Sequence, residues 1–121
     1  MNTAQLSVDK QAIELKAKLF RGFADPSRLM LIEALRGGKK SVGALVDITG
    51  LSQPNVSNHL RCLADCDLVK KERDGRYIYY RLSDKRITTI LQKSERLLSE
   101  VAKGVYDCTR YESTNESESN E

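Results

Sequence analysis

The amino-acid sequence has no apolar run that approaches the length of a membrane-spanning helix. Its first residues, MNTAQLSVDKQAIELK, lack the apolar core of a secretory signal peptide, so we expect a cytoplasmic protein without a membrane partner. A glycine-rich loop is also absent, and the chain has a single histidine. A thiol enzyme that pairs His59 with Cys62 has no evident third group to orient the pair, so the sequence does not predict an enzyme.

The formal net charge of +3 conceals a division of the chain. Four of the 17 acidic residues lie in the final segment ESTNESESNE, which contains no base. Residues 1–111 therefore carry 20 bases against 13 acids, a charge of +7, which indicates either a polyanionic partner or an ordinary basic surface. The length suits one domain, which we expect at residues 9–108, between a flexible N-terminus (1–8) and an acidic disordered tail (109–121).

Two helices are predicted in the first third of the chain. Apolar residues recur at helical spacing over residues 9–23. Asp25 and Pro26 are typical of the start of a second helix, because aspartate caps well and proline fits the first helical position. Gly37 and Gly38 would end this helix.

A helix-turn-helix unit is predicted in the segment SVGALVDITGLSQPNVSNHLRCL. Ser41 can cap a short helix that Gly50 ends. Ser52 can cap the next helix, which has Pro54 in its first turn. The pattern alone is weakly specific, because two helices and a glycine occur in many folds.

The segment LVKKERDGRYIYYRL adds weight to this interpretation. It has two β-prone runs around Asp74-Gly75, which predict a hairpin with a two-residue turn. A basic hairpin directly after a helix-turn-helix is typical of a wing that contacts the phosphate backbone or the minor groove. An ordinary edge hairpin that uses lysines to prevent aggregation is the alternative. Besides Arg81, its arms carry four bases that we expect to contact DNA, namely Lys70, Lys71, Arg73 and Arg76.

A long last helix is predicted at about residues 84–106. Its near-heptad apolar stripe can pack on its own domain or pair with a second subunit. We favour a homodimer to which the first helix contributes, because operators are usually read by dimers. The fold class is thus mainly α with a β-hairpin, a dimeric winged helix-turn-helix. The stripe consists of Ile87, Ile90, Leu91, Leu97, Leu98, Val101 and Val105.

The helix that follows Ser52 has separate apolar and polar faces. On a helical wheel, Val56, Leu60 and Leu63 fall together and form the predicted buried face. Short polar and basic residues lie on the other faces near the helix start, where base edges are usually read. A capped, solvated surface helix is the alternative. For His59 we rank DNA contact first, a local hydrogen bond second and metal binding third. The candidate DNA-contacting residues are Ser52, Gln53, Asn55, Ser57, Asn58, His59 and Arg61.

Three cysteines are an odd number, and the cytoplasm disfavours structural disulfides. Cys62 and Cys66 are four residues apart, so their sulfurs can meet over one helical turn and bind one soft cation. Two half-buried small residues are the alternative, although leucines already fill the buried face. Oxidation of this pair to a disulfide would instead make a redox-sensing repressor.

Cys108 follows the last helix, whose roughly 33 Å length would carry it away from the other two thiols of its own chain. In a two-fold dimer it could arrive beside the pair of the partner. Our hypothesis is two equivalent sites, each formed by Cys62 and Cys66 of one chain and Cys108 of the other.

The segments FADPSRLMLIEAL, LSQPNVSNHLRCLADCDLV and ERDGRYIYYRLSD resemble the ArsR/SmtB family of metal-responsive winged-helix repressors. The resemblance covers residues 19–105. It implies a metal-free homodimer that binds operator double-stranded DNA, blocks transcription and is released when metal binds.

The cysteine pattern narrows the branch of that family. The arsenic-sensing branch has cysteines in the helix before the reading helix, where this chain has GALVDITG. Two histidines of the zinc-sensing branch are replaced here by Arg86 and Leu97. The remaining pattern is similar to the cadmium- and lead-sensing branch, which implies that Cys62, Cys66 and Cys108 bind Cd(II) or Pb(II). Zn(II), Hg(II) or As(III) are possible inducers, and water, His59 or Asp65 could supply a fourth ligand.

Overall fold

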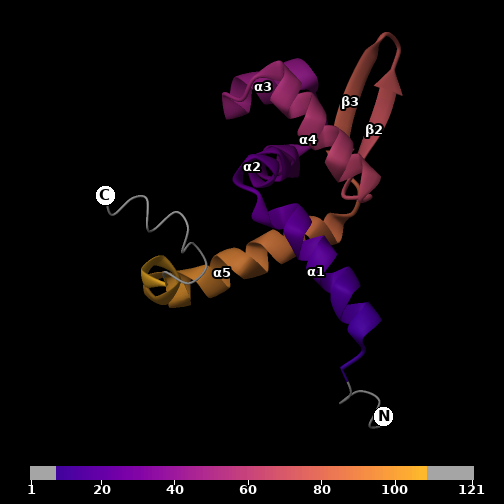
Figure 1. Cartoon of the computed structure of the whole chain (residues 1–121). Coiled ribbons are helices and arrows are strands. Elements are labelled where there is room, and N and C mark those ends of the chain that lie inside the picture. Colours follow the sequence, from indigo (N-terminus) through magenta and orange to yellow (C-terminus); the bar gives the residue numbers. More distant parts are fainter. Residues whose placement is uncertain (1–7, 109–121) are drawn as a thin grey trace. The chain divides into compact units, whose positions relative to one another are not determined.

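The computed structural model describes residues 8–108, which fall into two compact units. The second unit begins at residue 88 and consists of the larger part of helix α5 (Lys85–Asp107). No helix in the described range is long and apolar enough to cross a membrane. The expected acidic tail and all but Val8 of the expected flexible N-terminus lie outside this range. The first unit contains α1 (Lys10–Ala24), α2 (Pro26–Ala34), the 3-10 turn η2 (Leu35–Gly37), β1 (Lys40–Ser41), α3 (Val42–Thr49), α4 (Gln53–Asp65), β2 (Val69–Asp74) and β3 (Tyr77–Leu82) (Figure 1).

The start of α2 forms as the sequence predicts. The carboxylate of Asp25 accepts a 3.0 Å hydrogen bond from the backbone amide of Arg28, and Pro26 occupies the first turn. The η2 turn continues this helix to Gly37, and the chain leaves it at Gly38 with φ of 128°. The predicted end at the two glycines is therefore confirmed.

The helix-turn-helix unit is held by the predicted caps. The hydroxyl of Ser41 accepts a 3.1 Å hydrogen bond from an amide in the first turn of α3. Gly50 has the left-handed φ of 76° that a side chain would oppose, and it ends α3. The hydroxyl of Ser52 accepts a 3.3 Å hydrogen bond from the amide of Asn55 in α4. These caps set the positions of α3 and α4 in the chain.

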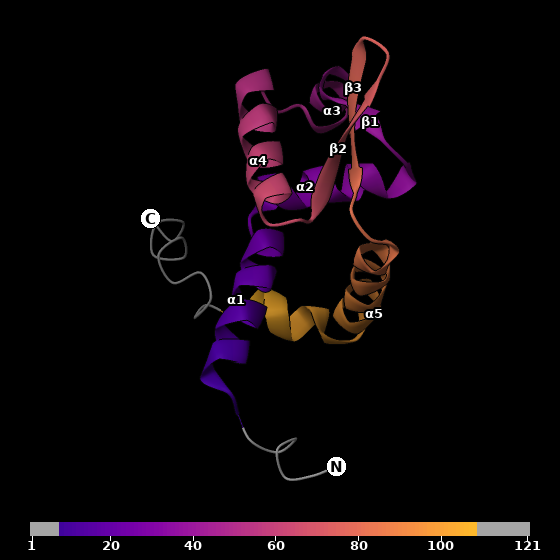
Figure 2. The same cartoon turned by 90° about the vertical axis from the view of Figure 1, so that its right-hand side faces the viewer.

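A small antiparallel sheet follows, with strand order β1-β3-β2 (Figure 2). The hairpin is paired as far as Asp74 and Tyr77, so its two-residue loop is Gly75–Arg76. The predicted loop, Asp74–Gly75, was therefore wrong by one position, because Asp74 remains in the ladder. Gly75 has φ of 65°, the sign that a type II′ turn needs at the first loop position.

The core of the first unit forms where α2 packs against both α3 and α4. The predicted buried face of α4 is confirmed, since the three side chains are at most 1% exposed. Burying each leucine or valine contributes roughly 1.5–3 kcal/mol, so this face fixes the rotation of α4 about its axis. The core of this unit includes Leu31, Ile32, Leu35, Leu45, Val56, Leu60, Leu63, Leu68 and Val69.

Helices α1 and α5 each leave apolar side chains exposed in the single chain. The bounds of α5 differ from those predicted by one residue at each end. On α1 the exposed residues include Leu15 and Phe20, and on α5 they include Leu97, Leu98 and Val101. Each helix thus carries apolar surface that a further protein surface could cover.

Candidate DNA-reading surface and thiol site

Helix α4 presents its polar residues away from the core. Most of the candidate DNA-contacting side chains on this helix are exposed, and Ser57 and His59 are half-buried. The hydroxyl of Ser52 also serves the cap of α4, so this residue positions the helix whether or not it touches DNA. The DNA contacts of all these candidate residues stay predictions. The structure leaves the exposed ones accessible to DNA. The exposed set is Ser52, Gln53, Asn55, Asn58 and Arg61.

His59 has a local partner. Its Nε2 atom lies 4.0 Å from Oδ2 of Asp25, the residue that caps α2, and its side chain is 22% exposed. This contact joins the middle of α4 to the corner between α1 and α2. This separation is longer than a hydrogen bond, so DNA contact, a local hydrogen bond and metal binding all stay predictions for His59.

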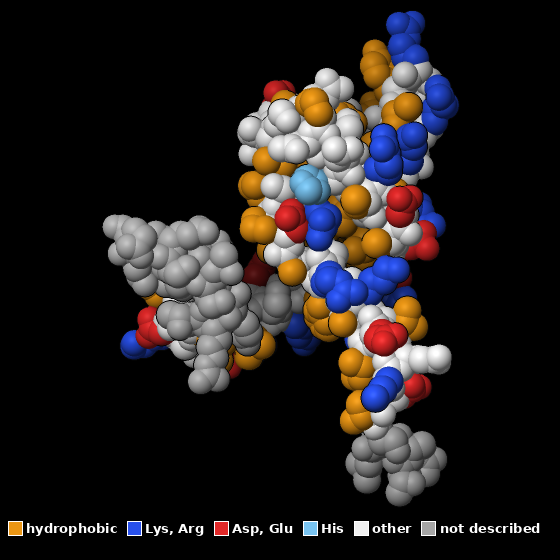
Figure 3. Space-filling view, in the orientation of Figure 1, with side chains coloured by type: hydrophobic (Ala, Val, Ile, Leu, Met, Phe, Trp, Pro, Cys, Tyr) orange, Lys and Arg blue, Asp and Glu red, His pale blue; other side chains and the backbone are white. Residues whose placement is uncertain are grey.

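The hairpin has two chemically different faces. Because successive side chains of a strand alternate, Glu72 and Asp74 share one face with Arg81, while Lys71 and Arg73 lie on the other. Figure 3 shows basic side chains gathered along the hairpin. Among the described residues, the four predicted wing cations have no salt bridge. They are Lys70, Lys71, Arg73 and Arg76.

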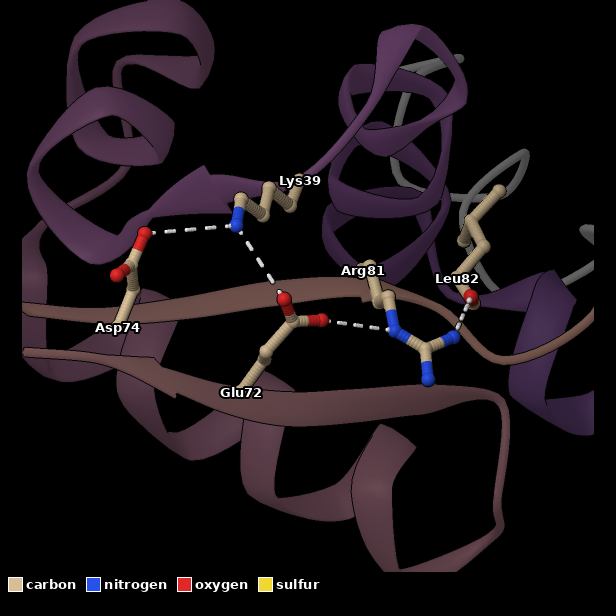
Figure 4. A network of polar contacts seen from close by, with 5 residues as sticks. All are labelled: Lys39, Glu72, Asp74, Arg81 and Leu82. Atoms are coloured by element: carbon tan, nitrogen blue, oxygen red, sulfur yellow. Dashed lines mark hydrogen bonds and ion pairs between the residues drawn. The ribbon is translucent and has the colours of Figure 1, made fainter.

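Figure 4 shows the ion network on the face with the two acids. Glu72 accepts hydrogen bonds from Nζ of Lys39 at 3.2 Å and from Nε of Arg81 at 3.0 Å. Lys39 also lies 3.8 Å from Asp74 and 4.9 Å from the ring centre of Tyr79. The hydrogen bond from Lys39 is the largest cause that lowers the pKa of Glu72. The charge of Lys39, the hydrogen bond from Arg81 and the charge of Arg81 lower this pKa further. The carboxylate is therefore anionic at neutral pH and offsets part of the positive charge of Lys39 and Arg81.

The two thiols of the pair lie at the end of α4. Cys62 and Cys66 are both free and exposed. Cys66 is the cap residue just past the helix, and its amide still donates to the carbonyl of Cys62 at 3.1 Å. Asp67 then turns the chain with φ of 62°. The exposure of both thiols argues against the alternative in which these cysteines are half-buried small residues.

Both thiols line one hollow of about 250 Å³ between α1, α2 and α4, which we call the thiol hollow. A neighbouring hollow of about 260 Å³ contains Cys66, Asp65 and Asp67 but not Cys62. Asp65, the suggested fourth ligand, therefore lines the hollow that holds only one thiol of the pair. The thiol hollow is lined by Lys18, Arg21, Gly22, Arg28, Cys62, Leu63 and Cys66.

One described chain does not assemble a complete metal site. Within residues 8–108 no group of three or more histidine, cysteine or acidic side chains could hold a metal ion. Cys108 is half-buried at the end of α5, where its amide donates to the carbonyl of Val105 at 3.2 Å. The expected ligand set therefore stays a prediction for the assembled protein.

The three cations of the thiol hollow were missed by the sequence reasoning. Lys18 and Arg21 belong to α1, and Arg28 belongs to α2. Nothing in the local pattern of these helices indicates that they would lie beside the cysteines. Their meeting depends on how α1 packs against the end of α4.

Residues 25–71 match the family model described as bacterial regulatory protein, arsR family. A probable mercury resistance operon repressor of Streptomyces lividans is 37% identical over 94 residues, which are 78% of this chain and 75% of that protein. This chain belongs to the arsR family. The expected family is thus confirmed, and it is a class of regulators and not of enzymes.

Two solved structures are similar to that of this arsR-family chain. The transcriptional regulator CmtR of Mycobacterium tuberculosis is 41% identical over 75 residues, 62% of this chain and 64% of that protein. The NMR structure of this cadmium metal-sensor covers 64% of this chain and 80% of that chain, with a TM-score of 0.58 and 40% identity. The match to a homodimeric winged helix-turn-helix DNA-binding domain from Mycobacterium bovis covers 81% of this chain and 93% of that domain's chain. Its TM-score is 0.70 and its sequence identity is 23%. The winged helix-turn-helix fold is confirmed by this likeness.

Proposed function

We propose that this protein is a transcriptional repressor that binds operator DNA as a metal-free homodimer and releases it when its cysteine thiolates bind a soft metal ion. One observation carries the proposal. Of the two exposed thiols of the thiol hollow, Cys62 lies on α4 and Cys66 caps it, and the first turns of this same helix present polar side chains for DNA. A ligand held by Cys62 and Cys66 therefore acts directly on the element that reads the bases.

The DNA-binding half of the proposal rests on α4 and the hairpin. Side chains near the N-terminal end of a reading helix contact base edges in the major groove. The wing cations, which have no salt bridge within the described part of the chain, supply phosphate contacts, which give most of the salt-dependent affinity. Both groups belong to elements of the same compact unit, which supports their joint use in DNA binding.

A homodimer is supported by the uncovered apolar residues of α1 and α5. A two-fold dimer presents two reading helices to two half-sites of an operator. It also brings a second copy of every thiol into the assembly. We assign Cys62 and Cys66 of one chain and Cys108 of the partner subunit to each metal site, since one described chain offers no group of three ligands.

The donor set suits soft and borderline ions. Three thiolates favour Cd(II), Pb(II), Hg(II), Zn(II) or As(III) over hard cations such as Mg(II). We rank Cd(II) and Pb(II) first because the cysteine pattern resembles that of the cadmium- and lead-sensing branch. This chain is also similar to the cadmium sensor named above. A hundredfold loss of operator affinity requires a coupling of roughly 3 kcal/mol between the metal and DNA sites.

The test uses reduced full-length protein and a duplex selected by that protein from a random library. Fluorescence anisotropy measures its affinity with a chelator present and then with Cd(II) or Pb(II). We expect tight binding without metal and a loss on the order of a hundredfold with it. Cys62→Ser should bind the duplex as the wild type does but lose the metal response. Equal affinity with and without every tested metal refutes the proposal.

The redox alternative is separated in the same assay. Peroxide is added to chelator-treated protein, and free thiols are counted before and after. We expect metal to release DNA from fully reduced protein, that is, protein in which all three free thiols are counted before the metal is added. Release by peroxide together with no response to metal would instead establish a redox-sensing repressor.

Sharing of the site between subunits has its own test. The Cys62→Ser/Cys66→Ser double variant and the Cys108→Ser variant are mixed, unfolded and refolded together. Only a heterodimer with a shared site regains all three thiols, so the sulfur-to-metal absorption should recover to about one quarter of the wild-type amplitude. If the three ligands belong to one chain, mixing restores nothing.

A further inference from the structure

The walls of the thiol hollow are cationic. Lys18 and Arg21 of α1 and Arg28 of α2 line it together with the two thiols, and none of the acidic residues between positions 8 and 108 does. Figure 3 shows basic side chains gathered in this region, where α1 approaches the end of α4. A site for a free divalent cation would gain nothing from such surroundings, because like charges repel.

Of the three charges, that of Arg28 is held in place by hydrogen bonds. Nη2 of Arg28 donates to the carbonyl of Arg21 at 2.8 Å, and its Nε donates to the carbonyl of Gly22 at 3.3 Å. At Gly22, a Cβ atom would lie 2.8 Å from Cδ1 of Leu68, so α1 packs closely on the segment after α4. Neither Lys18 nor Arg21 has a salt bridge with another residue in the described part of the chain.

The neighbouring hollow provides an internal contrast. It shares Lys18 and Cys66 with the thiol hollow, but Asp65 and Asp67 also line it. A ligand that uses both thiols must occupy the cationic hollow and not the acidic one. The charge of the bound complex therefore matters for affinity.

We propose that the cationic wall, formed by Lys18, Arg21 and Arg28, makes this site selective for metal-thiolate complexes that carry net negative charge. This inference rests on the proposed metal-sensing function. A divalent ion and three thiols give a trithiolate complex of charge −1, and three protons pass to the solvent. Arsenous acid and three thiols give a neutral trithiolate and three water molecules. The wall stabilises the first product and not the second, so it favours Cd(II) and Pb(II) over As(III).

The test removes two charges of the wall and keeps the fold. Lys18→Gln/Arg21→Gln changes two exposed side chains that form none of the described side-chain hydrogen bonds. The matched control is Lys10→Gln/Lys16→Gln, which removes the same charge from the same helix outside the hollow. Chelator competition gives the Cd(II) affinity and absorbance titration gives the As(III) affinity, and circular dichroism verifies the fold of each variant.

We expect Cd(II) affinity to fall about tenfold in the wall variant. The variant removes two charges, and each exposed charge interaction contributes up to about fivefold to the affinity. As(III) affinity should stay at the wild-type value, and the control variant should match the wild type for both. The Cd(II) loss should shrink at 1 M salt, where the screening length is about 3 Å. An unchanged Cd(II) affinity, or an equal loss for both elements, overturns the inference while the sensor proposal stands. Failure of the wild type to bind any of these metals refutes the proposed function itself.

Discussion

The salt dependence of operator binding should distinguish two arginines of the hairpin. Arg73 has no salt bridge among the described residues, whereas Nε of Arg81 donates to Glu72 at 3.0 Å. A free cation that neutralises a phosphate contributes about 0.9 to the slope of log affinity against log salt. In the proposed homodimer each substitution acts twice, so Arg73→Gln should reduce the slope by about 1.8. Arg81→Gln should change it little.

The difference is large enough to measure. Between 50 and 200 mM salt, a slope change of 1.8 means that wild-type affinity falls about tenfold more than that of Arg73→Gln. Fluorescence anisotropy at five or six salt concentrations in that range, on metal-free protein, gives both slopes. Each variant replaces the same side chain by the same amide, so each is the control for the other.

A third variant tests the cause. Glu72→Gln removes the acid that holds Lys39 and Arg81, so the slope should become steeper than that of the wild type. If Arg81→Gln lowers the slope as much as Arg73→Gln, the ion network does not withhold Arg81 from DNA. The assignment of the two hairpin faces would then be wrong.

Three other predictions concern stability and assembly. Ser52→Ala removes the acceptor of the 3.3 Å hydrogen bond from Asn55 and should lower the free energy of unfolding by about 1 kcal/mol in urea titrations; an unchanged stability would contradict the cap. Leu97→Glu places a charge on the exposed apolar face of α5, so light scattering should give the 13.6 kDa of one chain, against twice that mass for the wild type. A dimeric variant would exclude this face as the dimer contact. The pKa of Asp84 is held well below its ordinary value of 3.8, chiefly by its hydrogen bond with the side chain of Arg86. A lowered pKa stabilises the fold above the unfolded-state value and is lost as pH falls, so the wild type should lose more thermal stability than Asp84→Asn between about pH 5 and pH 2. Parallel pH curves would show that this contact contributes nothing.

The caps and faces of the helix-turn-helix could be predicted because they depend on neighbours in the sequence. A serine or aspartate caps an amide two or three residues later, and the buried face of α4 follows from 3.6 residues per turn. The hairpin was predicted for the same reason. Its loop was misplaced by one residue because the pairing of Asp74 with Tyr77 depends on the register of the whole ladder.

The surroundings of the thiols could not be predicted from local pattern. Lys18 and Arg21 look like solvated residues of an amphipathic helix, and Cys62 is about forty residues farther along. Only the packing of α1 on the end of α4 brings them to one hollow. His59 is a similar case, since its partner Asp25 belongs to the corner that the fold places beside α4.

The placement of the thiols limits how a metal can act on DNA binding. Cys62 lies four residues after Asn58, about 6 Å farther along the same helix at 1.5 Å per residue. Between and beside these positions, Leu60 and Leu63 are at most 1% exposed, so unwinding α4 would expose core leucines worth roughly 1.5–3 kcal/mol each. That cost equals or exceeds the roughly 3 kcal/mol of coupling that a hundredfold switch requires. In the proposed sensor, α4 therefore stays folded, and the metal changes DNA affinity by restraining the helix as a rigid body. Helical content measured by circular dichroism should be unchanged when Cd(II) releases the operator, and a loss of helix on metal binding would refute this mode of action.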